Sequence, residues 1–218
     1  MKDTPPGLKK CRLFKNIEDD VEKVTSCLGA KAVSYGKEGV VLLEGDAVES
    51  IGVILSGKVL IIKEDLNGNI SIIDELGEGE VFGESIICAG IKTSDVTVRA
   101  AERSRIMFLD YGKIITLCPN CCDYHLALIR NMVELIANKN VLLNKKMEII
   151  TKKTIREKLM SYFVLQSKTA GSRKFRIPFN RTELAFFIGA DRSAMTRELA
   201  HMEKDGLIRF DKKEFELM

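Results

Sequence analysis

A seven-residue repeat of apolar side chains between residues 126 and 150 constrains this chain more than any other stretch. The apolar positions follow one another in alternating steps of three and four residues, with the polar Asn140 filling one place in the series. They are Leu126, Ile129, Val133, Ile136, Leu143, Met147 and Ile150. This spacing is typical of a long helix that presents a narrow apolar seam to a second helix.

Two partners can cover such a seam: the chain's own preceding domain, or a second copy of the same helix. The strict alternation favours the second copy, because a helix packed on its own domain does not need it. Asn140 falls at an a position, where a buried Asn lowers stability but fixes a parallel, in-register pair. The predicted homodimer interface is Ile129, Val133, Ile136, Asn140, Leu143 and Met147. Off the seam, Leu128, Met132, Leu135 and Leu142 are expected to cover the domain that precedes the helix.

The region from about residue 30 to residue 110 has a different texture, in which short β-rich runs alternate with glycine. These runs lie at 40–46, 51–65, 66–76, 77–85 and 95–110, and Asn67-Gly68 between two apolar runs indicates a hairpin. Many short strands separated by turns predict a small barrel or sandwich. Before them, apolar residues at helical spacing predict one helix over 13–28, namely Leu13, Phe14, Ile17, Val21, Val24 and Leu28.

The charge of the chain is divided unevenly along its 218 residues. Residues 1–150 have a net charge of −3, whereas residues 151–218 carry 15 Lys and Arg against 9 Asp and Glu. A basic C-terminal segment behind an acidic body suggests an anionic partner for that segment.

The chain is expected to be cytoplasmic. No apolar run approaches the length of a membrane span, and the N-terminus lacks the apolar core of a signal peptide. Six cysteines without an export signal suggest reduced thiols.

Residues 180–204 contain two short helical patterns separated by Gly189-Ala190-Asp191. Asn180 and Glu183 can form a capping box at the first helix, Gly189 can end it, and Asp191 can cap the second. In the second helix Met195, Leu199 and Met202 are expected to point inward. The residues expected on its outer face are Arg192, Ser193, Thr196 and Arg197.

This pattern predicts a helix-turn-helix, in which the second helix enters the major groove of DNA. A further helix is predicted at 152–166, followed by a loop at Thr169-Ala170-Gly171-Ser172. The runs 174–178, 207–210 and 214–217 can form a small sheet, the wing. An ordinary helical hairpin with exposed arginines is the alternative, but the basic charge, the wing and the dimer helix together favour DNA binding.

Four motifs resemble the cyclic-AMP receptor protein/FNR (Crp/Fnr) superfamily of transcription regulators: "GVILSGKV" around Gly57, "GEVFGE" at 79–84, "VRA" at 98–100 and "GADRSAMTREL" at 189–199. The resemblance implies an α+β fold with an N-terminal antiparallel β-roll, the jelly roll of cyclic-nucleotide-binding domains, over 1–117. A dimerisation helix would follow at 118–150 and a winged helix-turn-helix at 151–218.

The resemblance also implies a homodimer on a two-fold site in double-stranded DNA, with RNA polymerase as a further partner. The implied DNA contacts are Arg192, Ser193, Thr196, Arg197, Arg181 and Thr182. Ser193 stands where many members have a cytosine-reading Glu. Because Ser reads bases less selectively, the target sequence is expected to differ from the commonest one.

Cyclic-nucleotide binders of this family hold the phosphate with a Gly-Glu pair and, eleven residues after the Gly, an Arg-Ser pair. Gly83 and Glu84 match, but Ser94 and Asp95 occupy the second place. A carboxylate there repels a phosphate. The effector pocket, sought at Gly83, Glu84, Ser85, Ser94 and Asp95, is therefore expected to take an unidentified effector other than cyclic AMP.

No cofactor is expected. FNR-type members hold an iron–sulfur cluster with several N-terminal cysteines, and only Cys11 lies there. Cys118, Cys121 and Cys122, near His125, are weak candidates for thiol redox sensing or for binding a metal or haem, and unpaired thiols are the favoured interpretation.

Two other functional classes are alternatives to a DNA-binding regulator. One is a ligand-sensing module that acts on a protein partner, which Arg192 and Arg197 argue against. The other is an enzyme, for which the sequence offers no nucleophile–base pattern, phosphate-binding loop, zinc-protease motif or paired catalytic carboxylates.

Overall fold

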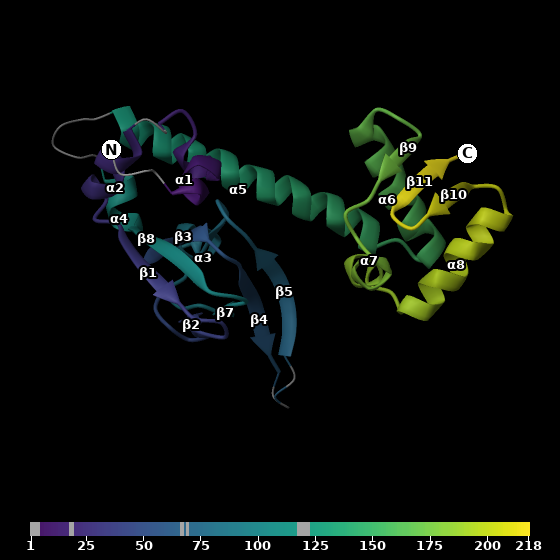
Figure 1. Ribbon diagram of the computed structural model, residues 1–218, viewed down its shortest axis with the longest axis horizontal. Helices are drawn as coiled ribbons and strands as arrows, with labels where there is room; N and C mark the ends of the chain where they lie inside the picture. The colour runs from purple at the N-terminus through teal and green to yellow at the C-terminus, as the bar shows by residue number, and fades with distance from the viewer. Residues whose placement is uncertain (1–4, 18–19, 66–67, 69, 117–122) are drawn as a thin grey trace. The chain divides into compact units, whose positions relative to one another are not determined.

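The computed structural model describes residues 5–17, 20–65, 68, 70–116 and 123–218. The chain divides into two compact units, Met1–Asn138 and Lys139–Met218. The division falls inside the long helix α5 (Asp123–Ile150), which therefore contributes residues to both units (Figure 1).

The first unit is built on two four-stranded antiparallel sheets, which form the predicted β-roll (Figure 1). One sheet has the order β1 (Lys31–Tyr35), β8 (Ser104–Asp110), β3 (Ser50–Ser56) and β6 (Val81–Phe82). The other has the order β2 (Val40–Leu42), β7 (Thr97–Ala100), β4 (Val59–Glu64) and β5 (Ile70–Leu76). Ile54 and Ile106 from the first sheet pack with Val59, Leu76 and Val98 from the second. This shared cluster joins the two sheets.

The predicted hairpin is present, because β4 pairs with β5 in antiparallel register from Val59↔Leu76 to Glu64↔Ile70. Gly68 in the connection has a φ of 80°, a conformation that glycine adopts without steric cost. Asn67, the other half of the predicted turn signal, lies outside the described residues.

The single helix predicted over 13–28 is wrong. The structure has α1 (Pro6–Lys10), a 3₁₀ turn at Arg12–Phe14 and α2 (Val21–Cys27) instead. Asn16 adopts a φ of 65°, which cannot continue a right-handed helix. The apolar residues on which the prediction rested are all buried nonetheless, so their periodicity reported the core and not a continuous helix.

The strand predicted over 77–85 is only partly present. Val81–Phe82 forms β6, and the chain then turns at Gly83 into the short helix α3 (Glu84–Cys88). A second short helix, α4 (Tyr111–Ile115), follows β8 and was not predicted.

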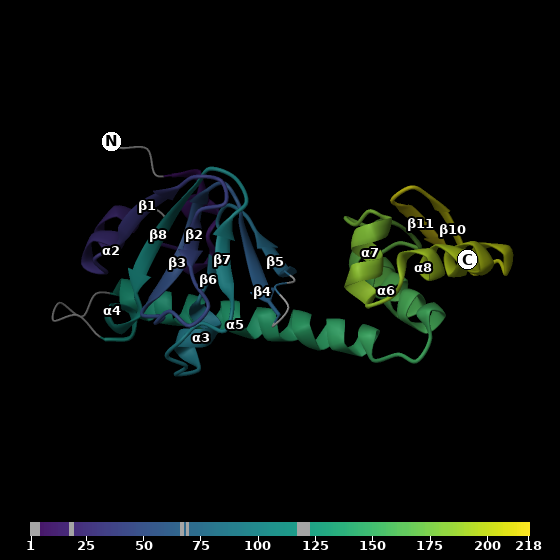
Figure 2. The same ribbon diagram turned by 90° about the horizontal axis from the view of Figure 1, so that it is seen from below.

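The N-terminal half of α5 runs along the β-roll (Figure 2). Side chains off the predicted seam pack against this unit. Leu128, Met132 and Leu135 are at most 8% exposed and share a cluster with Leu13 and Phe14. Leu142, which was predicted to cover the same domain, is 64% exposed, so that part of the prediction is wrong.

The second unit is the predicted winged helix-turn-helix. It consists of α6 (Ile155–Ala170), α7 (Arg181–Ile188), α8 (Arg192–Lys204) and a three-stranded sheet of order β10 (Ile208–Asp211), β11 (Glu214–Leu217) and β9 (Lys174–Arg176). Thr154 forms a capping box with Glu157 at the start of α6. Thr169 and Ala170, predicted as loop, belong to this helix, which ends where Gly171 takes a left-handed conformation.

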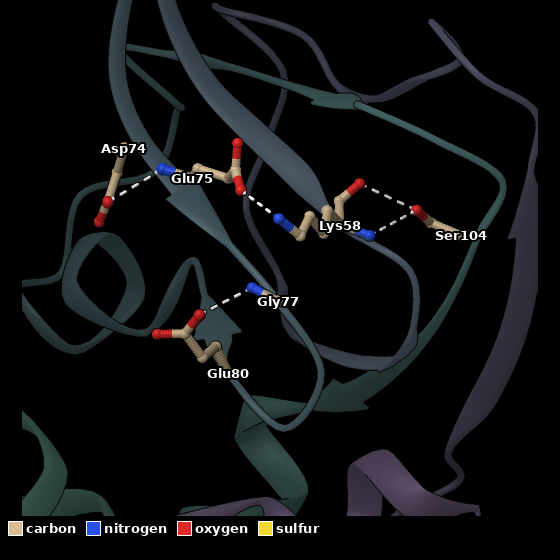
Figure 3. Close-up of polar contacts among 6 residues, drawn as sticks. All are labelled: Lys58, Asp74, Glu75, Gly77, Glu80 and Ser104. Carbon is tan, nitrogen blue, oxygen red and sulfur yellow. Dashed lines mark hydrogen bonds and ion pairs between the residues drawn. The ribbon is translucent and has the colours of Figure 1, made fainter. Parts of the chain in front are cut away.

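The turn between β3 and β4 closes through Gly57 and Ser104. The Ser104 hydroxyl accepts a hydrogen bond from the Lys58 backbone N–H at 3.1 Å and donates one to the Lys58 carbonyl at 2.9 Å (Figure 3). Gly57 has a φ of 81°, and a Cβ there would lie 2.6 Å from the Arg103 carbonyl oxygen. Only glycine therefore fits this turn without displacing backbone.

We expect Gly57→Ala to lower the free energy of unfolding by at least about 1–2 kcal/mol, the cost of a left-handed Ala, with the backbone clash added. Chemical denaturation followed by circular dichroism measures this change. Gly36→Ala is the matched control, because an added Cβ there meets no atom within 4 Å. Equal losses in the two variants would contradict the interpretation.

Candidate nucleic-acid interface

The predicted capping box fixes the start of α7. The Asn180 side-chain oxygen accepts hydrogen bonds from the backbone N–H groups of Thr182 and Glu183, at 2.9 and 3.0 Å. The Glu183 carboxylate in turn accepts one from the Asn180 N–H at 2.6 Å. These bonds satisfy amide groups that a helix start leaves without intrahelical partners.

The break between α7 and α8 has the predicted geometry. Gly189 ends α7 in the left-handed region, with a φ of 60°. The Asp191 side chain caps α8 by accepting a hydrogen bond from the Ala194 N–H at 2.8 Å. The carboxylate also lies at the positive end of the helix dipole, which stabilises it.

Helix α8 separates a buried side from a polar side. Met195, Leu199 and Met202 are 0% exposed and belong to the core of the second unit. The polar side holds the four residues predicted to face DNA, and all of them are exposed: Arg192, Ser193, Thr196 and Arg197.

The two arginines on α8 are available to a ligand. Within the described part of the chain, neither Arg192 nor Arg197 forms an ion pair, although ten other ion pairs occur there. The Thr196 hydroxyl is occupied, since it donates to the Arg192 carbonyl at 2.8 Å. Unpaired exposed guanidinium groups on a helix can donate two hydrogen bonds to a guanine edge or bind phosphate.

The two residues of α7 that were predicted to contact DNA differ in their exposure. Thr182 is exposed, whereas Arg181 is half-buried and lies over the wing. The Arg181 guanidinium carbon is 4.7 Å from the Phe210 ring centre and 5.2 Å from that of Phe215. Burial lowers the pKa of Arg181 from its ordinary value. This stacking joins α7 to the wing sheet.

Arg156 on α6 is paired with two carboxylates at α8, a contact that the sequence did not predict. Its Nε–H donates to the Glu198 carboxylate at 2.5 Å, and its Nη1–H donates to the Asp205 carboxylate at 2.7 Å. These carboxylates raise the pKa of Arg156. Glu198 and Asp205 lie 42 and 49 positions after Arg156, so no local sequence pattern connects them to it.

The predicted effector residues lie at the start of α3 and in the loop that precedes β7. Gly83, with a φ of 82°, begins α3, where Glu84 is 2% exposed and accepts a hydrogen bond from the Ser85 hydroxyl. Ser94 is 3% exposed, and its hydroxyl donates to the Val96 carbonyl at 2.7 Å. Asp95 is exposed and lies 3.8 Å from the ammonium group of Lys63.

The cysteine candidates Cys118, Cys121 and Cys122 lie outside the described residues. Among the described cysteines, Cys11 is buried, Cys27 is exposed, and burial raises the pKa of Cys11 to about 11. His125, the neighbour of the candidate group, is buried. The described residues contain no group of three or more His, Cys, Asp and Glu placed to hold a metal.

A β-roll in one unit and a winged helix-turn-helix in the other define a DNA-binding regulator of transcription. Residues 32–121 match the family model of the cyclic nucleotide-binding domain, and residues 157–218 match that of the Crp-like helix-turn-helix domain. The chain belongs to the Crp/Fnr family of transcriptional regulators.

Known relatives match over most of their length. The cyclic AMP receptor protein of Thermus thermophilus is 24% identical to this chain, and the match covers 93% of this chain and 90% of that protein. A probable transcriptional regulator of Lacticaseibacillus casei, named flp, is 23% identical over 94% of this chain and 91% of its own.

Solved structures share the fold. A CooA variant from Carboxydothermus hydrogenoformans has a TM-score of 0.59 at 18% identity, with 88% of this chain and 85% of that chain covered. The c-di-GMP-responsive global regulator CLP of Xanthomonas campestris has a TM-score of 0.58 at 20% identity, with 91% and 98% covered. No described helix is both long and apolar enough to cross a bilayer.

We expect Asp191→Ala to lower the stability of the second unit by about 1 kcal/mol, because the Ala194 N–H loses its cap. Asp191→Asn is the control, since the amide oxygen can still accept that hydrogen bond. Thermal unfolding of the three proteins gives the comparison. A loss as large in the Asn variant as in the Ala variant would show that the cap is not the cause.

Proposed function

We propose that this chain is a homodimeric, sequence-specific DNA-binding regulator switched by an effector that is not a cyclic nucleotide. The observation that carries the proposal is the exposed apolar side chains of α5 at Val133, Leu143 and Met147, on the helix that links the β-roll to the winged helix-turn-helix. We further propose that RNA polymerase is a partner, as the resemblance implies.

The α8 surface supports sequence-specific DNA binding. Arg192 and Arg197 are exposed and unpaired within the described chain, and they lie on the first two turns of a helix whose opposite side is buried. A helix placed in this way can reach the major groove with its N-terminal half. Ser193 lies beside Arg192 and would add a contact to a base or a phosphate, whereas the Thr196 hydroxyl, which donates to the Arg192 carbonyl, could only accept from a base.

The seam of α5 supports the dimer. Val133, Leu143 and Met147 are 62%, 62% and 54% exposed, whereas the off-seam residues Leu128, Met132 and Leu135 are buried. Ile129 and Ile136 of the predicted seam are half-buried and pack against the β-roll cluster, so the uncovered part of the seam is Val133, Leu143 and Met147. Exposed apolar side chains on one helix mark an interaction surface. The regular 3–4 spacing supports a second α5 as the partner. Asn140 is exposed in the single chain, and its side-chain oxygen accepts a hydrogen bond from Asn144 at 2.8 Å.

The effector domain supports a ligand other than cyclic AMP. Ser94 stands where the binders have their arginine, and its hydroxyl is held by a backbone carbonyl. Asp95 next to it is exposed and lies 3.8 Å from the ammonium group of Lys63. The place of the family's arginine fork is therefore taken by a hydroxyl and a carboxylate, neither of which neutralises a phosphate.

The DNA-binding proposal predicts that replacing Arg192 and Arg197 together by Ala abolishes the preference for the specific site. Each good arginine–guanine contact contributes about 1–3 kcal/mol, so each single variant should lose about 5- to 150-fold in affinity. The slope of log affinity against log salt should fall by about 1 for each phosphate contact that is removed. Fluorescence anisotropy with a duplex selected from a random pool measures both quantities.

Arg105→Ala is the control for this experiment, because Arg105 is also exposed but lies on β8 of the first unit. It should bind DNA like the unaltered chain. If the double α8 variant also kept the full DNA affinity and salt slope, base recognition by α8 would be refuted. The alternative function, a ligand-sensing module that acts on a protein partner, would then be favoured.

The dimer proposal is tested by two neighbouring leucines on α5. Leu143 and Leu142 are 62% and 64% exposed, but only Leu143 lies on the seam. Leu143→Glu should yield monomers of 24.4 kDa in sedimentation equilibrium, because two carboxylates would face each other in the interface. Leu142→Glu should leave a species of twice that mass. A dimer in both variants, or monomers in both, would contradict the assigned seam.

A further inference from the structure

The first turn and a half of α6 is hydrogen-bonded to α8 and to the turn that precedes it. The Arg156 guanidinium donates to the Glu198 carboxylate in the middle of α8 at 2.5 Å and to the Asp205 carboxylate at its end at 2.7 Å. The Lys158 ammonium group donates to the Gly189 carbonyl, just before α8 begins, at 3.4 Å. One short stretch of α6 therefore holds α8 at its start, middle and end.

The two contacts of Arg156 constrain how α8 is oriented. Glu198 and Asp205 are seven residues apart, about two helical turns, so they lie on the same side of α8. Leu159 of α6 and Leu199 of α8 share the core of this unit, but apolar packing has little directional preference. A guanidinium is a planar fork whose hydrogen bonds have fixed directions. Held at two points two turns apart, α8 can neither rotate about its axis nor tilt against α6 without breaking one of them.

The orientation of α8 decides which contacts its arginines can form. Arg197 directly precedes Glu198, and both Arg192 and Arg197 project from the exposed side of the helix. A bidentate contact with guanine needs two N–H groups aligned with O6 and N7 at once. A phosphate attracts the same guanidinium as a charge over a wide range of positions. Rotation of α8 would therefore weaken base recognition more than it weakens phosphate binding.

The ion pairs themselves contribute little to whether this unit folds. The side chains of Arg156, Glu198 and Asp205 are 40%, 23% and 49% exposed, and ion pairs that water reaches stabilise a fold only weakly. The unit is held together by its buried apolar core. Loss of the contacts is therefore expected to change the orientation of α8 in a unit that stays folded.

We infer that Arg156 is a positioning residue for base recognition by α8. It acts through Glu198 and Asp205, by holding α8 where Arg192 and Arg197 can meet guanine edges, and in this role it contacts no base itself. The inference rests on the proposed DNA-binding function.

Arg156→Lys in the full chain tests the inference, because Lys keeps the positive charge but lacks the fork. Fluorescence anisotropy gives the affinity for a duplex selected from a random pool and for a scrambled duplex, and the ratio of the two is the specificity. We expect the ratio to fall at least about fivefold, the low end of the value of one arginine–guanine contact. The scrambled-duplex affinity and its salt slope should stay within about twofold, since no charge is removed. An unchanged ratio would overturn the inference.

Replacing Glu198 and Asp205 together by Ala distinguishes positioning from a direct contact of Arg156 with DNA. This variant keeps Arg156 but releases it from α8. The affinity for the scrambled duplex should rise, because two negative charges are removed, while the specificity ratio again falls at least about fivefold. A ratio that is kept or raised would mean that Arg156 does not act through α8, and would contradict its positioning role.

Arg176→Lys is the matched control. Arg176 belongs to the same unit but lies in the wing sheet, where it pairs with one carboxylate, that of Glu214, at 3.6 Å. This variant should keep the specificity ratio. Thermal unfolding followed by circular dichroism reports on the fold of each variant. A purely structural role for Arg156 would lower the melting temperature and the affinities for both duplexes, but it would leave their ratio unchanged.

The unaltered chain reports separately on the proposed function. A preference for the selected duplex supports the regulator, and the variants then decide the role of Arg156. A preference in the unaltered chain that all variants keep contradicts the positioning role alone. Equal affinity of the unaltered chain for both duplexes contradicts the proposed function, and the role of Arg156 in base recognition with it.

Discussion

The two apolar faces of α5 are the constraint on which the rest of this structure depends. One face is satisfied within the chain, because Leu128, Met132 and Leu135 are buried against the β-roll unit. The other face leaves Val133 and Leu143 more than half exposed. Exposed apolar surface is unfavourable in water, and covering it with a partner lowers the free energy. We propose that a second α5 is this partner, so that dimerisation and the placement of the DNA-binding units share one helix.

The winged helix-turn-helix could be predicted almost completely because its determinants are local. The Asn180 capping box, the left-handed Gly189 and the Asp191 cap each depend on residues within three or four positions. The same local character identified Met195 and Leu199 as core residues. Contacts between distant segments were not predicted. Arg156 reaches Glu198 and Asp205 only after the tertiary fold has formed, and Arg181 stacks on the wing because β10 and β11 bring Phe210 and Phe215 beside it.

The β-roll was predicted as an architecture but less well in its details. Short β-rich runs between glycines identified the strands other than β1. The break at Asn16 and the short helix after Gly83 depend on single backbone conformations. The motif comparison directed attention to Gly83 and Glu84, which the structure places at the start of α3. A ligand pocket is formed by side chains from several strands, and no spacing rule along the chain describes it.

The central claim is that two copies, joined through α5, read one DNA site with paired α8 helices. Hydroxyl-radical footprinting on a duplex selected from a random pool tests it most directly. The account predicts two symmetry-related protected half-sites with centres about 10 base pairs, or about 34 Å, apart. A single protected segment, or two segments in direct repeat, would contradict it.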